Sequence, residues 1–165
     1  MNIVLIGMPA CGKSTAGVIL AKRLGMGFID ADLVIQAQSG MLLQEIIDTK
    51  GTDAFFAAEE SALTSILCDR CVIATGGSAV YSERGMKHLK ENGVLVYIKL
   101  SLDEIEKRLT NLSVRGVVGA ADKSLGELYD ERTPLYEKYA DVVIEADGLS
   151  TDGVIVSISK AIENT

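Results

Sequence analysis

The chain has 165 residues, a length that fits one domain with a substantial core. Its hydrophobic fraction of 48% argues against a disordered chain, and its net charge of −7 argues against a nucleic-acid surface, which is usually basic. No apolar run approaches the roughly 18 residues of a membrane span, so we expect no membrane partner. The N-terminus lacks the basic segment of a signal peptide, so we expect a cytoplasmic protein, and for this size a monomer.

Short apolar runs alternate with helical stretches along the sequence. We expect strands at residues 2–6, 27–30, 71–75, 94–99 and 141–145. We expect helices at residues 13–24, 32–38, 42–50, 54–67, 83–91, 102–109, 124–138 and 151–163. This alternation predicts an α/β fold with a parallel sheet flanked by helices, and a ligand site at the carboxyl ends of the strands.

The segment after the first expected strand, residues 7–14, reads G-x-x-x-x-G-K-S, the pattern of a phosphate-binding P-loop. Gly7 and Gly12 permit backbone angles that let amide groups converge on a phosphate at the start of the next helix. Lys13 is predicted to reach the outer phosphates and Ser14 to ligate Mg²⁺. A chance glycine-rich turn is the alternative, and the strand before and helix after the loop disfavour it. The predicted nucleotide site comprises Gly7, Ala10, Cys11, Gly12, Lys13, Ser14 and Thr15.

Two carboxylates follow the second expected strand. Asp30 is predicted to hold Mg²⁺, directly or through water, and Asp32 to orient or deprotonate an attacking hydroxyl. The alternative for Asp32 is a cap on the helix that starts at Leu33, a role compatible with catalysis. Gly76, Gly77 and Ser78 follow the third expected strand, and paired glycines there let the backbone approach a small ligand. A plain strand-to-helix turn is the alternative for this second segment.

Cys68 and Cys71 form a C-x-x-C, which suggests a redox pair or half a metal site. The chain has no second such pair and one histidine, so we favour the ordinary meeting of a helix end and a buried strand. That histidine, His88, lies in a polar stretch and is predicted to be a surface residue, so histidine acid–base catalysis is not expected.

Residues 111–123 form a small, glycine-containing segment between two expected helices. It is either a connector or, in a phosphotransferase, a lid with Arg115 near its centre. Arg115 would then neutralise charge on the transferring phosphoryl group. Arg132 precedes Thr133 and Pro134 and is predicted to pair with a substrate carboxylate. Each of these arginines alone is more often a solvated helix residue.

Taken together, these motifs resemble the shikimate kinase family. The similar segments, in order, are residues 7–14, 28–32, Gly51 and Phe55 with Glu59, residues 74–77, Arg108 with Arg115, and residues 132–136. The resemblance implies a single P-loop kinase domain over residues 1–165 with strand order 2-3-1-4-5, an acceptor-binding helical region at about 31–62 and a lid at about 111–123. It implies ATP as co-substrate, Mg²⁺ as cofactor and a small hydroxylated metabolite as acceptor, in aromatic amino acid biosynthesis.

The resemblance also implies roles for single residues. Arg108 would stack near the adenine, and Lys13, Asp32 and Arg115 would be catalytic. Ser14 and Asp30 would serve the metal ion. The implied acceptor site comprises Asp32, Phe55, Phe56, Glu59, Gly76, Gly77, Ser78 and Arg132.

Three departures from the family pattern fall in the acceptor half. An arginine that grips the shikimate carboxylate is expected after Phe55, and this chain has Phe56. The third glycine is Ser78, and the lid pattern Arg-Pro-Leu-Leu reads Arg-Gly-Val-Val from Arg115. Losing one charge-assisted bond is worth about 1.5–3 kcal/mol, or roughly ten- to a hundredfold in affinity.

The predicted function is ATP-dependent phosphorylation of a hydroxyl on a small metabolite. The leading candidate reaction is the conversion of shikimate to shikimate 3-phosphate. A same-fold kinase for another polyol, sugar acid or metabolite, and a catalytically silent nucleotide-binding module, are the alternatives.

Overall fold

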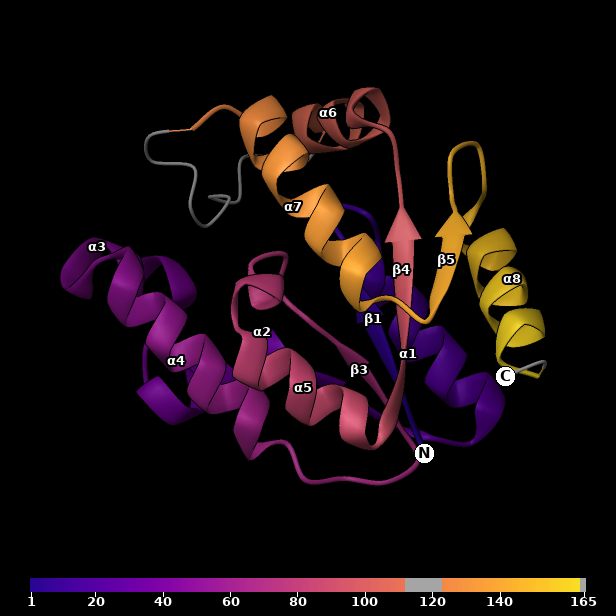
Figure 1. Cartoon of the computed structure of the whole chain (residues 1–165), viewed down its shortest axis with the longest axis horizontal. Helices are drawn as coiled ribbons and strands as arrows, with labels where there is room; N and C mark the ends of the chain where they lie inside the picture. Colours follow the sequence, from indigo (N-terminus) through magenta and orange to yellow (C-terminus); the bar gives the residue numbers. More distant parts are fainter. Residues whose placement is uncertain (112–122, 164–165) are drawn as a thin grey trace.

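A computed structural model describes residues 1–111 and 123–163. Its centre is a sheet of five parallel strands in the order β2-β3-β1-β4-β5, which confirms the expected α/β fold and strand order (Figure 1). The strands are β1 (Asn2–Ile6), β2 (Gly27–Asp30), β3 (Cys71–Ala74), β4 (Gly93–Lys99) and β5 (Val142–Glu145). In the register of β1, Val4 stands between Ile73 of β3 and Leu95 of β4. All five residues of β1 are buried, as its unbroken apolar sequence predicts for a central strand covered on both faces.

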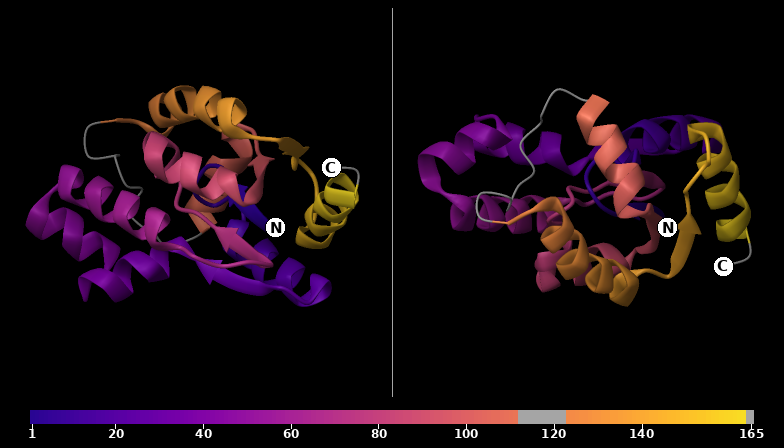
Figure 2. Two further views of the ribbon diagram at one scale, coloured as in Figure 1. Left: turned by 60° about the horizontal axis from the view of Figure 1, so that its bottom comes forward. Right: turned by 90° about the horizontal axis from the view of Figure 1, so that it is seen from above.

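Helices cover both faces of the sheet. They are α1 (Lys13–Leu24), α2 (Ala31–Ser39), α3 (Leu43–Lys50), α4 (Thr52–Ser65), α5 (Glu83–Glu91), α6 (Leu102–Asn111), α7 (Leu125–Tyr139) and α8 (Thr151–Glu163). Helices α1 and α8 pack together on one face, and α5 and α7 pack on the other, with α4 against α5. In both views of Figure 2, the group α2–α4 and helix α8 lie at opposite ends of the molecule. No helix in the described ranges is both long and apolar enough to cross a bilayer.

The group α2–α4 has an apolar cluster of its own, centred on Ile35, Ile46, Phe55 and Ala62. The expected helix at 54–67 begins two residues earlier, directly after Gly51, and ends at Ser65 because the backbone of Ile66 is extended. A single turn of 3₁₀-helix, η1 (Ala79–Tyr81), was not predicted, since three residues carry no detectable period. The other predicted strands and helices agree with the structure to within two residues at each end.

Candidate active site at the carboxyl edge of the sheet

The P-loop joins β1 to α1 at the carboxyl edge of the sheet. Gly7 has φ 146°, and a Cβ there would stand 2.7 Å from the carbonyl oxygen of Ile98, so the close approach to β4 requires glycine. Ala10 also has a positive φ, of 64°. The buried Lys13 folds back across the loop, and its Nζ donates to the carbonyl oxygens of Gly7 (2.8 Å) and Met8 (2.9 Å). The ammonium group is therefore held inside the curve of the loop.

Arg108 reaches the same loop from α6. Its Nη1 donates to the carbonyl oxygen of Ala10 at 3.3 Å and lies 4.0 Å from where a Cβ on Gly12 would stand. Cys11 is buried in the loop, and Thr15 is exposed on the first turn of α1. The structure thus gathers the predicted nucleotide residues of the described ranges in the P-loop, in the first turn of α1 and at Arg108 on α6. Arg115 lies outside the described residues.

Asp30, the predicted metal ligand, ends β2, and Asp32, the predicted acceptor-orienting carboxylate, lies two residues later in α2. The Ser14 hydroxyl donates to Asp30 Oδ2 at 2.7 Å, which places a hydroxyl and a carboxylate side by side. Asp30 Oδ1 accepts from the backbone N–H of Asp32 at 3.0 Å, so Asp30 is the N-cap of α2. The alternative that Asp32 caps this helix is wrong, because the helix begins at Ala31 rather than Leu33, and Asp32 lies in its first turn.

Two carboxylates converge beside Gly76. A Cβ on Gly76 would stand 2.7 Å from Glu59 Oε1 and 2.9 Å from Asp32 Oδ1. Burial, reinforced by the neighbouring Asp30 and opposed by Lys13, raises the pKa of the Asp32 carboxyl above its usual range. Burial raises the pKa of Glu59 to about 7, against the hydrogen bond from Ser78 and the charge of Arg132.

Glu59 is 2% exposed, and its two oxygens differ. Oε2 accepts a hydrogen bond from the Ser78 hydroxyl at 2.7 Å. Oε1 has no hydrogen-bond partner among the described residues. Buried polar atoms are nearly always paired, so an unpaired carboxylate oxygen beside a predicted ligand site calls for a donor from outside the described residues.

A guanidinium group stands beside the next glycine. Arg132, on α7 and 1% exposed, has its Nη1 3.1 Å from where a Cβ on Gly77 would stand. Its Nε donates to the Tyr81 hydroxyl at 3.2 Å, and its Cζ lies 5.2 Å from the centre of the Tyr81 ring. The Tyr136 hydroxyl donates to the carbonyl oxygen of Gly77 at 2.6 Å, which ties α7 to this turn.

Phe56 is half-buried against Tyr81, with ring centres 5.6 Å apart in an edge-to-face arrangement. The two rings border a cavity of about 260 Å³ between α4 and η1, lined by Phe56, Ala57, Glu59, Glu60, Ser78, Tyr81 and Ser82. Tyr81 was not predicted, since only the tertiary contact with Arg132 distinguishes it from any other tyrosine. Phe55, predicted at the acceptor site, is 1% exposed and packs inside the apolar cluster of the group α2–α4.

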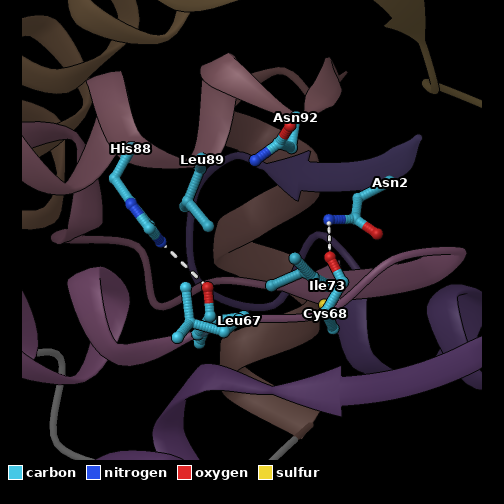
Figure 3. Close-up of a pocket in the computed structure, with 8 residues that line it drawn as sticks. Asn2, Leu67, Cys68, Ile73, His88, Leu89 and Asn92 are labelled. Carbon is cyan, nitrogen blue, oxygen red and sulfur yellow. Dashed lines mark hydrogen bonds between the residues drawn. The ribbon is translucent and has the colours of Figure 1, made fainter.

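A second, smaller cavity of about 150 Å³ lies near the N-terminus, away from the P-loop (Figure 3). Contrary to the expectation of a surface residue, His88 is half-buried, and its Nε2 lies 2.9 Å from the carbonyl oxygen of Ile66.

The Asn2 side chain donates to the carbonyl oxygen of Cys68 and accepts from the N–H of Cys71, both at 2.9 Å. The C-x-x-C thus joins the segment after α4 to the start of β3, as expected. Burial, together with the Cys71 thiol, raises the pKa of Cys68 to about 11, which keeps this thiol protonated at neutral pH.

Comparisons with known proteins agree over almost the whole chain. The family model described as shikimate kinase matches residues 9–163. The shikimate kinase of Thermodesulfovibrio yellowstonii is 39% identical, with 98% of this chain and 95% of that protein covered. A shikimate kinase of Francisella tularensis subsp. holarctica is 35% identical, with 96% of this chain and 92% of that protein covered. The structure of a shikimate kinase from Acinetobacter baumannii in complex with shikimate superposes with a TM-score of 0.88 at 28% identity, covering 99% of this chain and 93% of that one.

Proposed function

Because the chain belongs to the shikimate kinase family, we propose that it transfers the γ-phosphoryl group of ATP to a hydroxyl of a small carboxylated metabolite, with shikimate the first acceptor to test. Family members are ATP-dependent phosphotransferases that act on an alcohol group. The observation that carries the proposal is that the charge of Lys13, beside the P-loop, acts on Asp32, while Asp32 and Arg132 approach the consecutive residues Gly76 and Gly77 after β3. The relative whose structure contains shikimate has the same fold over nearly all of its length.

The P-loop supplies the phosphate site in this proposal. Its amide groups and the start of α1 favour negative charge. Two of the three donors on Lys13 Nζ bond loop carbonyls, and the third faces the Cys11 sulfur at 3.5 Å, a weak acceptor. A phosphate oxygen would replace that sulfur as the better acceptor. Arg108, bonded to Ala10 on the same loop, would lie beside the nucleotide.

Magnesium fits the pair formed by Ser14 and Asp30. A hydroxyl and a carboxylate oxygen 2.7 Å apart are hard donors of the type that Mg²⁺ prefers. When bound with ATP, the ion neutralises charge on the phosphate oxygens. The same hydrogen bond ties the Ser14 hydroxyl, in the first turn of α1, to the end of β2.

Asp32 and Arg132 have complementary roles toward the acceptor. The raised pKa of Asp32 makes its carboxylate a better proton acceptor, so it can orient the attacking hydroxyl and take its proton. Arg132 would bind the acceptor carboxylate through its planar guanidinium. Phosphoryl transfer depends chiefly on such positioning and charge stabilisation, and for that reason the absence of a catalytic histidine is no obstacle. Residues 111–123 would supply the lid and Arg115.

A coupled assay of ADP release with Mg·ATP and shikimate tests the proposal. We expect turnover that is lost in Lys13→Ala and kept in Lys22→Ala, a matched change at an exposed lysine of the same helix. Nucleotide binding without acceptor-dependent ADP release, with shikimate or with any member of a panel of polyols and hydroxy acids, would instead support a catalytically silent nucleotide-binding module.

A further inference from the structure

Groups of opposite charge approach two consecutive glycines of the predicted acceptor site. Over Gly76 stand two carboxylate oxygens, Glu59 Oε1 and Asp32 Oδ1, within 2.7 and 2.9 Å of one point. Over Gly77 stands the guanidinium of Arg132, 3.1 Å from the corresponding point. Gly76 and Gly77 are consecutive, with Cα atoms about 3.8 Å apart, so two carboxylate oxygens and a guanidinium group approach neighbouring residues of the chain.

One of the two carboxylate oxygens beside Gly76 lacks a hydrogen-bond donor among the described residues. Glu59 is 2% exposed, its Oε1 has no partner among the described residues, and Ser78 fixes its other oxygen. Phe56, on the same helix as Glu59, is apolar and adds no positive charge beside it. A neutral hydroxyl of an acceptor would satisfy Oε1 with one hydrogen bond but would add no positive charge between the buried Glu59 and the half-buried Asp32, whose nearby cations are Arg132 and Lys13. An ammonium group offers three donors and also cancels charge.

We propose that this site accepts hydroxylated amino acids, with the acceptor's ammonium group at Glu59 and Asp32 and its carboxylate at Arg132. The inference rests on the proposed kinase function and names a second class of acceptor for it. An α-amino acid carries its ammonium and carboxylate groups on one carbon, which matches acidic and basic groups that approach two consecutive residues, Gly76 and Gly77. Shikimate carries the carboxylate and the hydroxyls but no cation.

The transfer step is the ordinary one for a kinase. The side-chain hydroxyl oxygen of the amino acid forms a bond to the γ-phosphorus of ATP as the bond from that phosphorus to the β–γ bridging oxygen breaks. ADP leaves with the bridging oxygen, and the hydroxyl proton goes to the carboxylate of Asp32. The products are ADP and an O-phosphorylated amino acid, and no further reactant is needed.

Pairs of acceptors that differ only in the amino group test this inference. The pairs are L-homoserine with 4-hydroxybutyrate and L-serine with 3-hydroxypropionate, assayed with Mg·ATP alongside shikimate. We expect kcat/KM for at least one amino acid to exceed that of its deaminated partner by about tenfold or more, the effect of one charge-assisted contact. Glu59→Gln keeps an acceptor for Ser78 but removes the charge, and we expect it to reduce that ratio below about threefold. Glu91→Gln, the same change at an exposed residue of α5, should leave the ratio unchanged.

Calorimetric titration of each pair into the wild-type chain gives a measurement that needs neither turnover nor a folded variant. Tighter binding of the amino acid supports the inference. Equal affinity within both pairs, or no binding of either amino acid, overturns it. Turnover of shikimate combined with equal kcat/KM within both pairs also overturns it while leaving the proposed function standing. The absence of acceptor-dependent ADP release with shikimate and with every other acceptor tested refutes the proposed function, whichever pair member binds more tightly.

Discussion

The buried Glu59 carboxyl should make the stability of the chain depend on pH in an unusual direction. Its pKa is about 7 in the folded chain against an ordinary value of 4.5, so the folded state binds this proton more tightly than the unfolded state does. The contribution of this group to stability is therefore complete below pH 4.5 and is lost as the pH rises through 7. Carboxylates in ion pairs behave in the opposite way, because their folded pKa is depressed.

The magnitude follows from the size of the change in pKa. An increase from 4.5 to about 7 corresponds to about 3 kcal/mol between the two extremes of pH, and to about 2–3 kcal/mol between pH 5 and 8. Glu59→Gln removes the titration while its amide oxygen can still accept from Ser78. We therefore expect the variant to gain about 2–3 kcal/mol relative to wild type on going from pH 5 to pH 8.

Urea unfolding of both proteins at pH 5, 6, 7 and 8 measures this difference. Using the difference between the two proteins cancels every other group that titrates in both. Glu91→Gln, at an exposed position, provides the control and should show no such gain. A difference between Glu59→Gln and wild type that does not change with pH would refute the argument that burial keeps Glu59 protonated near neutrality.

Three further changes have definite expected outcomes. Gly7→Ala places a Cβ 2.7 Å from the carbonyl oxygen of Ile98 at a φ of 146°, so nucleotide binding measured by calorimetry should be lost or fall by more than about tenfold. Phe56→Arg adds a guanidinium beside Glu59, and kcat/KM for shikimate should rise by about tenfold or more; no change would mean that Arg132 alone suffices for the acceptor carboxylate. Asn2→Ala removes two hydrogen bonds around the C-x-x-C, so Tm should fall by several degrees while KM for ATP stays constant.

The fold was predictable because its signals are local or periodic. The strands are short apolar runs, and the P-loop has fixed spacing in the strand–loop–helix setting that it requires. Segment boundaries were less predictable where a side chain decides them: the carboxylate of Asp30 caps α2, so the helix begins at Ala31 and Asp32 falls inside its first turn. The turn of η1 carries no period, so it was missed.

The acceptor half could be predicted only as a set of residues, because its chemistry arises between segments distant in sequence. Glu59 and Ser78 are 19 positions apart, and Arg132 meets Tyr81 across 51 positions. Neither the raised pKa of Glu59 nor its unpaired oxygen is visible in a helical sequence that reads Ala-Ala-Glu-Glu-Ser. Burial by the neighbouring segments produces both.

Two of the three departures from the family pattern, Phe56 and Ser78, have a common physical consequence. Phe56 brings no charge to the side of Glu59, and Ser78 supplies the hydroxyl that holds Glu59 Oε2. A single neutral hydrogen bond is a weaker compensation for a buried carboxylate than a cation, which agrees with the raised pKa. The nucleotide half shows no such deficit, since Lys13, Ser14 and Asp30 all have partners within the chain. The described residues of the phosphate end thus already have partners, whereas the acceptor end holds a buried carboxyl of raised pKa whose Oε1 has no partner among the described residues.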